Sequence, residues 1–338
     1  MSLIYNATFD SQTRILSLLD KAGNVISSCE VPSKEDPLTL TATADNSSVN
    51  LMKEGTLSNT YEVDTGSGWQ SYTFGTVIHL NSGESCKWRC KSHPTTQSGP
   101  NRVKFVMSGK IEASGNCNSM LSSDFKNLTS LTGYDCAFVS LFQGCNSLTK
   151  PPVLPATTLS NSCYSIMFKG CSGLIQAPKL PATALSYRCY DYMFGDCTAL
   201  TEAPELPATE LAESCYSYMF AYCRSLTKAP EQLPATTLTK YCYSNMFSVC
   251  NALPKAPLLP ATTLAEHCYS HMFGSCTSLR EVRIAATDIS ANYCISAWMQ
   301  NVPDTGDFYC DPNTTFPSDM SGIPKNWTRH ALADYPQT

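Results

Sequence analysis

The chain has 338 residues, of which 43% are hydrophobic and 15% are charged, and its net charge is -5. This length accommodates two or more domains with full-sized cores. The weakly acidic balance provides no basic field for nucleic acid or anionic lipid, and no apolar run approaches the ~20 residues that cross a bilayer. We therefore expect neither nucleic-acid binding nor membrane insertion, and the first residues lack the pattern of a secretory signal peptide.

The N-terminal part predicts β structure in two modules. Residues 4–31 contain three short strand-like runs, which predict a small β module over residues 1–33. Residues 33–37 (SKEDP) are polar and end in proline, as linkers often do. From there on, strand signals recur every 8–12 residues between glycine, serine and asparagine. This spacing favours a β-sandwich over residues 38–108.

A tandem repeat of 26 residues dominates the rest of the chain. Equivalent cysteines recur at spacings of 26 or 27 residues: Cys163, Cys189, Cys215, Cys242, Cys268 and Cys294. A fixed period of this length is the signature of a solenoid, in which each unit buries its apolar face against its neighbours. We place a solenoid at residues 110–302, with degenerate first units, and a C-terminal cap at residues 303–338.

The repeat unit divides into an extended part and a periodic part. In the unit at residues 174–199, Pro178 and Pro181 bar a helix and favour an extended stretch. Farther along, apolar residues recur at every fourth position, which we interpret as one face of a helix. These residues are Leu185, Cys189, Met193 and Cys197. The expected fold class is therefore α+β, with N-terminal all-β modules followed by a leucine-rich repeat solenoid of 26-residue strand–helix units.

The pattern Met-Phe-x-x-Cys-x-x-Leu identifies the repeat class by resemblance. It occurs five times in tandem, as MFKGCSGL, MFGDCTAL, MFAYCRSL, MFSVCNAL and MFGSCTSL. It resembles the leucine-rich repeats of the BspA type, found on surface proteins of gut and oral bacteria and on phage tail proteins of the same habitat. The resemblance covers about residues 110–302. It implies a role in recognition or adhesion and carries no catalytic residues.

The chain contains 18 cysteines, which raises the question of disulfides. On the predicted helix Cys189 and Cys197 would lie about 12 Å apart, and neighbouring helices about 8–10 Å apart. Both spacings exceed the ~6.8 Å between Cα atoms that a disulfide tolerates. We therefore expect packed, reduced thiols. Cys86, Trp88 and Cys90 share one face of a predicted strand, which favours packing over a zinc site.

No arrangement of residues predicts catalysis. His267 and His271 have the four-residue spacing of a zinc-binding pair, but the equivalent positions of other units hold unrelated residue types. We expect these positions to face solvent. No nucleophile has a base and an orienting carboxylate at a recognisable spacing. We predict that the protein is not an enzyme and holds neither a cofactor nor a metal.

Two sets of residues in the repeats are candidates for binding. An unvaried tyrosine column could stack on sugar rings, although an unvaried residue in a repeat favours a structural role. Its members are Tyr164, Tyr190, Tyr216, Tyr243 and Tyr269. The positions that vary between units form the candidate binding surface. They are represented by Tyr187, Arg188, Glu213, Tyr218, Lys240, Tyr241, Glu266 and His267.

These observations favour a non-enzymatic recognition protein. The leading hypothesis is a phage or prophage tail-associated receptor-binding protein, assembled in the bacterial cytoplasm, that attaches to a bacterial surface through the repeat face. The alternative is an exported cell-surface adhesin of the BspA type that binds host protein or glycan, and a third class is a cytosolic interaction scaffold. The expected partners are a surface protein or glycan of a bacterial or host cell, and other virion or surface-assembly proteins that bind the N-terminal β module. A second copy of the chain is a further candidate partner.

Overall fold

The computed structural model describes residues 6–10, 15–19, 22, 25–30, 35–92, 102–317 and 319–335. Helical structure within these ranges is limited to two 3-10 turns, η1 (Cys117–Met120) and η2 (Leu332–Asp334). None of the helical segments described is long and apolar enough to cross a membrane.

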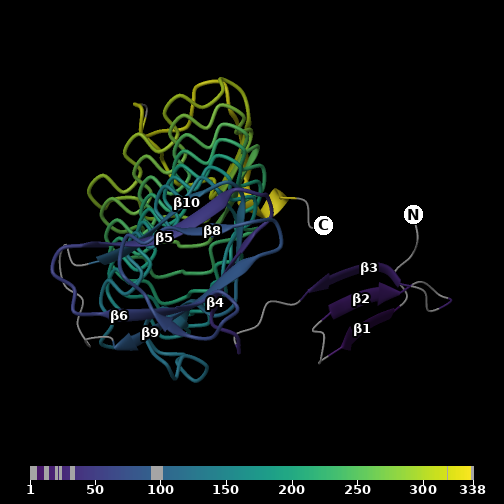
Figure 1. Cartoon of the computed structure of the whole chain (residues 1–338). Coiled ribbons are helices and arrows are strands. Elements are labelled where there is room, and N and C mark those ends of the chain that lie inside the picture. The colour runs from purple at the N-terminus through teal and green to yellow at the C-terminus, as the bar shows by residue number, and fades with distance from the viewer. Residues whose placement is uncertain are drawn as a thin grey trace.

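The first three strands form an antiparallel sheet of their own (Figure 1). They are β1 (Asn6–Asp10), β2 (Ile15–Leu19) and β3 (Val25–Glu30). The three strands predicted for residues 4–31 are thus present, in the order of the chain.

Two larger sheets follow and share one core. One has the order β10-β5-β8, formed by β5 (Ser47–Glu54), β8 (Ile78–Leu80) and β10 (Arg102–Ser108). The other has the order β12-β11-β4-β9-β6-β7, formed by β4 (Leu38–Ala42), β6 (Thr60–Asp64), β7 (Gln70–Ser71), β9 (Ser85–Ser92), β11 (Ile111–Ser114) and β12 (Leu148–Lys150). Trp88 of one sheet meets Phe105 of the other with 5.2 Å between ring centroids. Cys86 and Cys90 are buried on the same face of β9 as Trp88, as the alternation predicts.

The solenoid continues the second sheet without a break in the core. β11 pairs with β4 on one side and, in parallel, with β12 of the next coil on the other. The ring of Phe105 stacks on Phe142 of the repeats, with 5.3 Å between centroids. The β-sandwich gives way to the solenoid near residue 109, and one hydrophobic core extends across both.

The segments that the sequence analysis interprets as helices are stacked turns, so the prediction of strand–helix units is wrong. The N–H of Tyr190 donates to the Cys215 carbonyl of the next coil, at 3.0 Å. The next N–H, that of Asp191, instead closes a turn onto the Arg188 carbonyl, at 3.2 Å. This alternation continues along each segment, and Figure 1 shows the result as flat coils stacked on one another. The fold is therefore almost entirely β.

The helix prediction failed because the apolar residues recur at exactly every fourth position, whereas an α-helix has 3.6 residues per turn. Residues four apart on an α-helix drift by about 40° per step, and would leave a common face within a few steps. Here every fourth residue has a left-handed backbone, with φ of 51° at Arg188, 54° at Tyr192 and 62° at Asp196. This repeated turn keeps the segment flat. The period of four therefore directs Cys189 and Met193 inward without drift.

Flat coils place equivalent residues directly over one another. Rings in the phenylalanine column from Phe142 to Phe273 lie 5.5–5.9 Å apart and nearly parallel. The tyrosine column from Tyr164 to Tyr269 has spacings of 5.6–5.9 Å, and its members are at most 1% exposed. The tyrosine column is therefore part of the core, and its rings are not available to a sugar.

The cysteine columns form hydrogen bonds as well as filling space. The thiols of Cys197, Cys223 and Cys276 donate to phenylalanine carbonyls of the preceding coil at 3.0–3.1 Å. The helix spacings used above to exclude disulfides do not apply, because the coils stack at backbone hydrogen-bond distance. The 17 cysteines whose surroundings are described are all unpaired. Burial raises the pKa of the Cys276 thiol to about 12.

Thiol titration tests this description of the columns. Denatured, non-reduced protein is expected to react with Ellman's reagent at nearly all of its 18 cysteines. Native protein at pH 8 is expected to react at few of them, because buried thiols with raised pKa values are poor nucleophiles. Among the 17 cysteines whose surroundings are described, Cys136 is only half-buried and is expected to react first. A denatured sample that stays largely unreactive until it is reduced would contradict free thiols.

The C-terminal residues extend the solenoid. β13 (Lys255–Leu259), β14 (Glu281–Ile284), β15 (Asp307–Cys310) and β16 (Thr328–Ala331) form a parallel sheet in chain order. The region assigned to a cap, residues 303–338, thus adds two further strands. Trp298 packs against Phe308 and Phe316, with 5.9 and 6.4 Å between ring centroids. These rings cover the core of the last coil.

Candidate functional site

The left-handed residues of the coils form one surface, which we call the turn face. They are exposed or half-buried in almost every coil, while the two residues that follow each of them are mostly buried. A left-handed backbone is uncommon for residues other than glycine, so the solenoid constrains these positions strongly. Its three columns are Ser162-Arg188-Ser214-Tyr241-His267-Tyr293, Ile166-Tyr192-Tyr218-Asn245-His271-Ala297 and Gly170-Asp196-Tyr222-Val249-Ser275-Asn301.

The structure places all eight predicted binding residues on or beside this face. Four of them belong to its columns: Arg188, Tyr218, Tyr241 and His267. The other four each precede the first column by one residue: Tyr187, Glu213, Lys240 and Glu266. They fall into two groups, one around Arg188 and Tyr218 and one around Tyr241 and His267.

Tyr192 is the centre of the first group and is held from two sides. The ammonium of Lys169 lies 4.1 Å from its ring centroid, a favourable cation–π distance. The backbone of Gly195 lies under the same ring, and any side chain there would overlap it. Tyr218 meets the ring edge-on at 5.4 Å, and the Tyr192 hydroxyl donates to Asp196 at 3.3 Å. The aromatic part of this group is therefore fixed before any ligand arrives.

An ion pair lies beside these rings. Arg188 donates from Nε and Nη2 to one carboxylate oxygen of Asp191, at 3.2 and 2.6 Å. The arginine side chain is 48% exposed, whereas that of the aspartate is 9% exposed. Burial raises the pKa of the Asp191 carboxyl, and the hydrogen bonds from Arg188 oppose that rise.

The second group is a ladder of parallel rings. His267 stacks between Tyr241 and Tyr293, with centroid distances of 4.5 and 5.0 Å. Beside the ladder, Lys240 pairs with Glu266 at 2.9 Å. Within the described ranges, no three His, Cys, Asp or Glu side chains are grouped to hold a metal ion.

The candidate residues selected from the sequence leave out Tyr192, Tyr222 and Tyr293 of this face, and the buried Asp191 beside it. Exposed tyrosine is the property that marks the face: Tyr187 is 44% exposed, Tyr218 41%, Tyr222 37% and Tyr293 66%. Counting in fours from Arg188 reaches Tyr192, and the same count in the next coil reaches Tyr222. The exact period of four was thus the signal that could have located Tyr192 and Tyr222.

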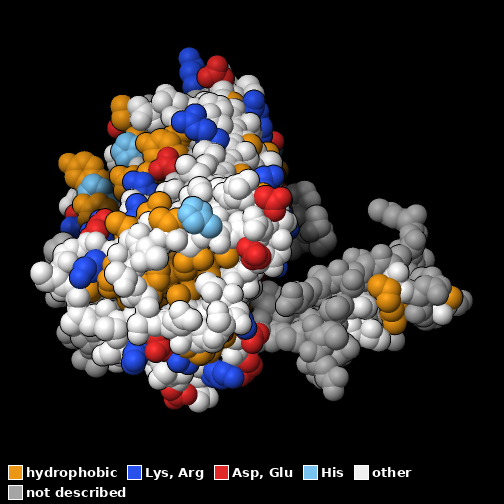
Figure 2. Space-filling view, in the orientation of Figure 1, with side chains coloured by type: hydrophobic (Ala, Val, Ile, Leu, Met, Phe, Trp, Pro, Cys, Tyr) orange, Lys and Arg blue, Asp and Glu red, His pale blue; other side chains and the backbone are white. Residues whose placement is uncertain are grey.

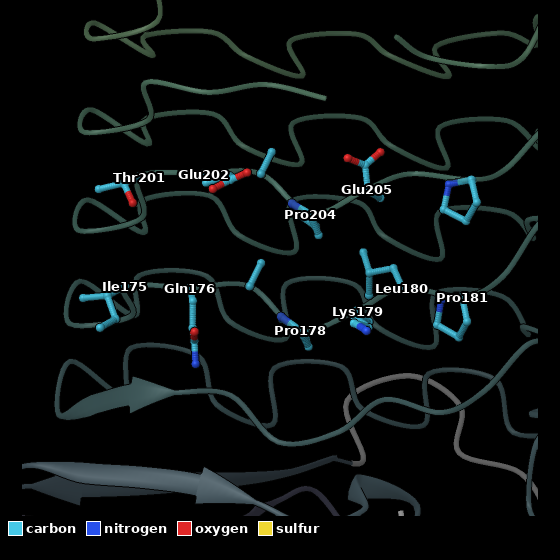
Figure 3. Close-up of a pocket in the computed structure, with 13 residues that line it drawn as sticks. Ile175, Gln176, Pro178, Lys179, Leu180, Pro181, Thr201, Glu202, Pro204 and Glu205 are labelled. Carbon is cyan, nitrogen blue, oxygen red and sulfur yellow. The ribbon is translucent and has the colours of Figure 1, made fainter. Parts of the chain in front are cut away.

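The opposite side of the coils, which we call the strand face, is formed by the proline-containing segments 174–181, 200–207, 226–234 and 253–260. A hollow of about 590 Å³ lies between the first two of these segments (Figure 3). Its walls include prolines and exposed side chains such as Ile175 and Glu205. Glu202 of this wall pairs with Lys228 of the next coil.

Farther along, the chain itself covers the strand face. The hydroxyl of Tyr335 lies 2.8 Å from the Lys255 ammonium, and the Arg283 guanidinium lies 4.5 Å from the Tyr335 ring centroid. Arg283 also pairs with Glu231 at 2.8 Å. The charged side chains here mainly satisfy one another.

A third, smaller surface lies on the outer side of the sheet β10-β5-β8. Figure 2 shows hydrophobic side chains gathered over this sheet with few charges between them. Met52, Val77 and Val106 are exposed there. Arg102 of β10 pairs with Glu54 and donates to Ser140 at one end of this sheet. The turn face combines such a fixed guanidinium with several exposed tyrosines and is therefore the best-developed candidate.

No protein-family model matches the chain. No curated protein matches it either. Among solved structures, a leucine-rich repeat protein from Bacteroides ovatus ATCC 8483 is similar at 18% sequence identity and a TM-score of 0.27. The alignment covers 52% of this chain and 52% of that one, so the chain spans about half the length of that protein.

Proposed function

We propose that the chain is a non-enzymatic recognition protein that attaches to a cell surface through the turn face. The observation that carries this proposal is the group of exposed tyrosines on consecutive coils, together with Arg188. Tyrosine and arginine are the residues that most often dominate binding energy at interfaces. Tyrosine, serine and asparagine, which recur in the three columns, are also enriched in antibody paratopes.

Within this class we propose a phage or prophage tail-associated receptor-binding protein. The support is the resemblance of the repeats to the BspA type, together with a small N-terminal sheet, β1–β3, that would join other tail proteins. The free, hydrogen-bonded thiols favour folding in a reducing compartment such as the bacterial cytoplasm. The alternative is an exported BspA-type adhesin on a bacterial cell surface. The repeats support both proposals equally, whereas the thiols favour the first.

Binding of the fluorescently labelled full chain to a panel of fixed bacterial cells tests the turn face. We expect the triple variant Tyr187→Ala, Tyr218→Ala and Tyr222→Ala to lose at least tenfold in cell attachment, because losses at interface tyrosines often exceed ~1 kcal/mol each. Its melting temperature is expected to change little, since these side chains are partly exposed.

The matched control changes the opposite side of the same coils. The variant Ile175→Ala, Gln176→Ala and Lys179→Ala removes exposed side chains from the strand-face hollow and is expected to attach like the wild type. Attachment that survives the tyrosine variant but is lost in this control would move the binding site to the strand face. A wild-type chain that attaches to no cell in the panel would count against a recognition function.

A further inference from the structure

Asp191 differs in charge from the equivalent residues of the other coils. The equivalent residues of neighbouring coils are all serine: Ser165, Ser217, Ser244, Ser270 and Ser296. An earlier coil has Val139 there, so the coil does not require a carboxylate at this position. A buried carboxylate costs free energy unless it is paired. The coil itself does not account for the aspartate, whereas its ion pair with Arg188 does.

That partner, Arg188, is also an exception in its column. The residues directly before and after it in the column are the small Ser162 and Ser214, and the side chain of Tyr187 interacts with the guanidinium from its own coil. A guanidinium has five N–H donors, and Asp191 accepts two of them on one edge. The buried carboxylate therefore fixes the direction of a half-exposed cation.

Of the charged groups around the ion pair of Arg188 and Asp191, Arg188 is the one that faces solvent. Lys169 lies near the same buried carboxylate, but its ammonium is placed over the Tyr192 ring. The second carboxylate of the group, Asp196, accepts a hydrogen bond from the Tyr192 hydroxyl. Two fixed, half-exposed rings, Tyr192 and Tyr218, thus lie in the same patch as an oriented guanidinium.

Building on the proposed function, we propose that this patch binds an acidic sugar whose carboxylate pairs with Arg188. Charge-assisted hydrogen bonds from a guanidinium to a carboxylate are short and strong, and favour a planar anion of this kind. The C–H groups of a sugar ring pack against aromatic side chains such as Tyr192 and Tyr218. Asp191 is then a positioning residue that acts through Arg188.

Matched polymers test the ligand class on the full chain. The probes are immobilised polygalacturonate, its fully methylated ester, poly(glycerol phosphate) and poly(glutamate). We expect the wild type to bind polygalacturonate at least tenfold more tightly than the ester, because esterification removes the charge and leaves the sugar rings in place. We also expect polygalacturonate to be preferred over the phosphate and protein-like polymers.

Two variants use residues that the repeats already tolerate. In the double variant Arg188→Ser and Asp191→Ser, both positions carry the residue found in the neighbouring coils, so no charge is left buried without a partner. We expect a ratio of acid to ester affinity near one and an unchanged melting temperature. Asp191→Asn keeps a hydrogen-bonding side chain without its charge and is expected to lower the ratio. A merely structural role for Asp191 would shift the melting temperature and leave the ratio unchanged.

Several results would overturn this inference while leaving the proposed function intact. One is equal binding of acid and ester by the wild type, and another is an unchanged ratio in the double variant. A preference for poly(glycerol phosphate) would assign the site to a phosphate, and a preference for poly(glutamate) would assign it to an acidic protein. Failure of the proposed function is recognised separately, by a wild type that attaches to no cell or by a tyrosine variant that attaches as well as the wild type.

Discussion

Phe220→Ala is expected to lower the free energy of unfolding by about 3–5 kcal/mol, as large-to-small changes at fully buried aromatic residues do. The side chain of Phe220 is completely buried. Its ring stacks between Phe194 and Phe247, with centroid distances of 5.6 and 5.5 Å. Removing the ring therefore deprives two neighbouring coils of a contact as well as its own.

Hydrogen exchange measured by coil distinguishes a shared core from independent units. We expect backbone protection to fall in the coils of Phe194 and Phe247 as well as in the mutated one, because each coil buries its apolar side only against its neighbours. Ile175→Ala is the control: this side chain is 59% exposed, and its loss is expected to change stability by no more than about 0.5 kcal/mol. Loss of protection restricted to a single coil would contradict the shared core.

Gly115→Ala is expected to destabilise the junction between the sandwich and the first coil by about 2–5 kcal/mol. Gly115 has φ of 71°, a conformation that costs a residue with a side chain about 1–2 kcal/mol. An added methyl group would also overlap the Pro37 carbonyl, which would force the backbone apart at a further cost of about 1–3 kcal/mol. The next N–H, that of Asn116, donates to the Asp36 carbonyl at 2.8 Å and would be displaced with it.

Gly133→Ala separates the cost of the left-handed backbone from the cost of the steric overlap. Gly133 has φ of 83°, but nothing lies within 4 Å of the position that its methyl group would take. We therefore expect only the conformational cost, about 1–2 kcal/mol. Urea unfolding of both variants measures the difference. Equal losses in the two variants would show that the close approach of Gly115 to Pro37 contributes nothing to stability.

Part of the architecture could be predicted from the sequence because it depends on local patterns. Alternation along β9 placed Cys86, Trp88 and Cys90 on one buried face, and the structure confirms this. Three N-terminal strands were predicted from short apolar runs, and three are present. Alternation and turn residues act between near neighbours in the chain, which is why they are visible in one sequence.

The candidate site could be predicted from the sequence only in part. The variation between repeats led to Arg188 and Tyr218, which the structure places on the turn face. It did not lead to Tyr192, whose contacts with Lys169 of the preceding coil and Tyr218 of the next depend on how the coils stack. Nor did it show that Asp191 is buried and turned toward Arg188, since that pairing depends on the turn between them.

The sequence by itself determined the repeat and its length of 26 residues, because identical units impose identical coils. It also determined which residues recur in the core, such as the cysteines and phenylalanines. Only the tertiary structure decided that the periodic segments are stacked turns. Half of the N–H groups in those segments find their acceptors in the next coil, as Tyr190 does in Cys215. A single unit lacks those acceptors, so the pattern of apolar residues in one repeat resembled that of a helix. The neighbouring coil supplies the acceptors and thereby determines the backbone conformation.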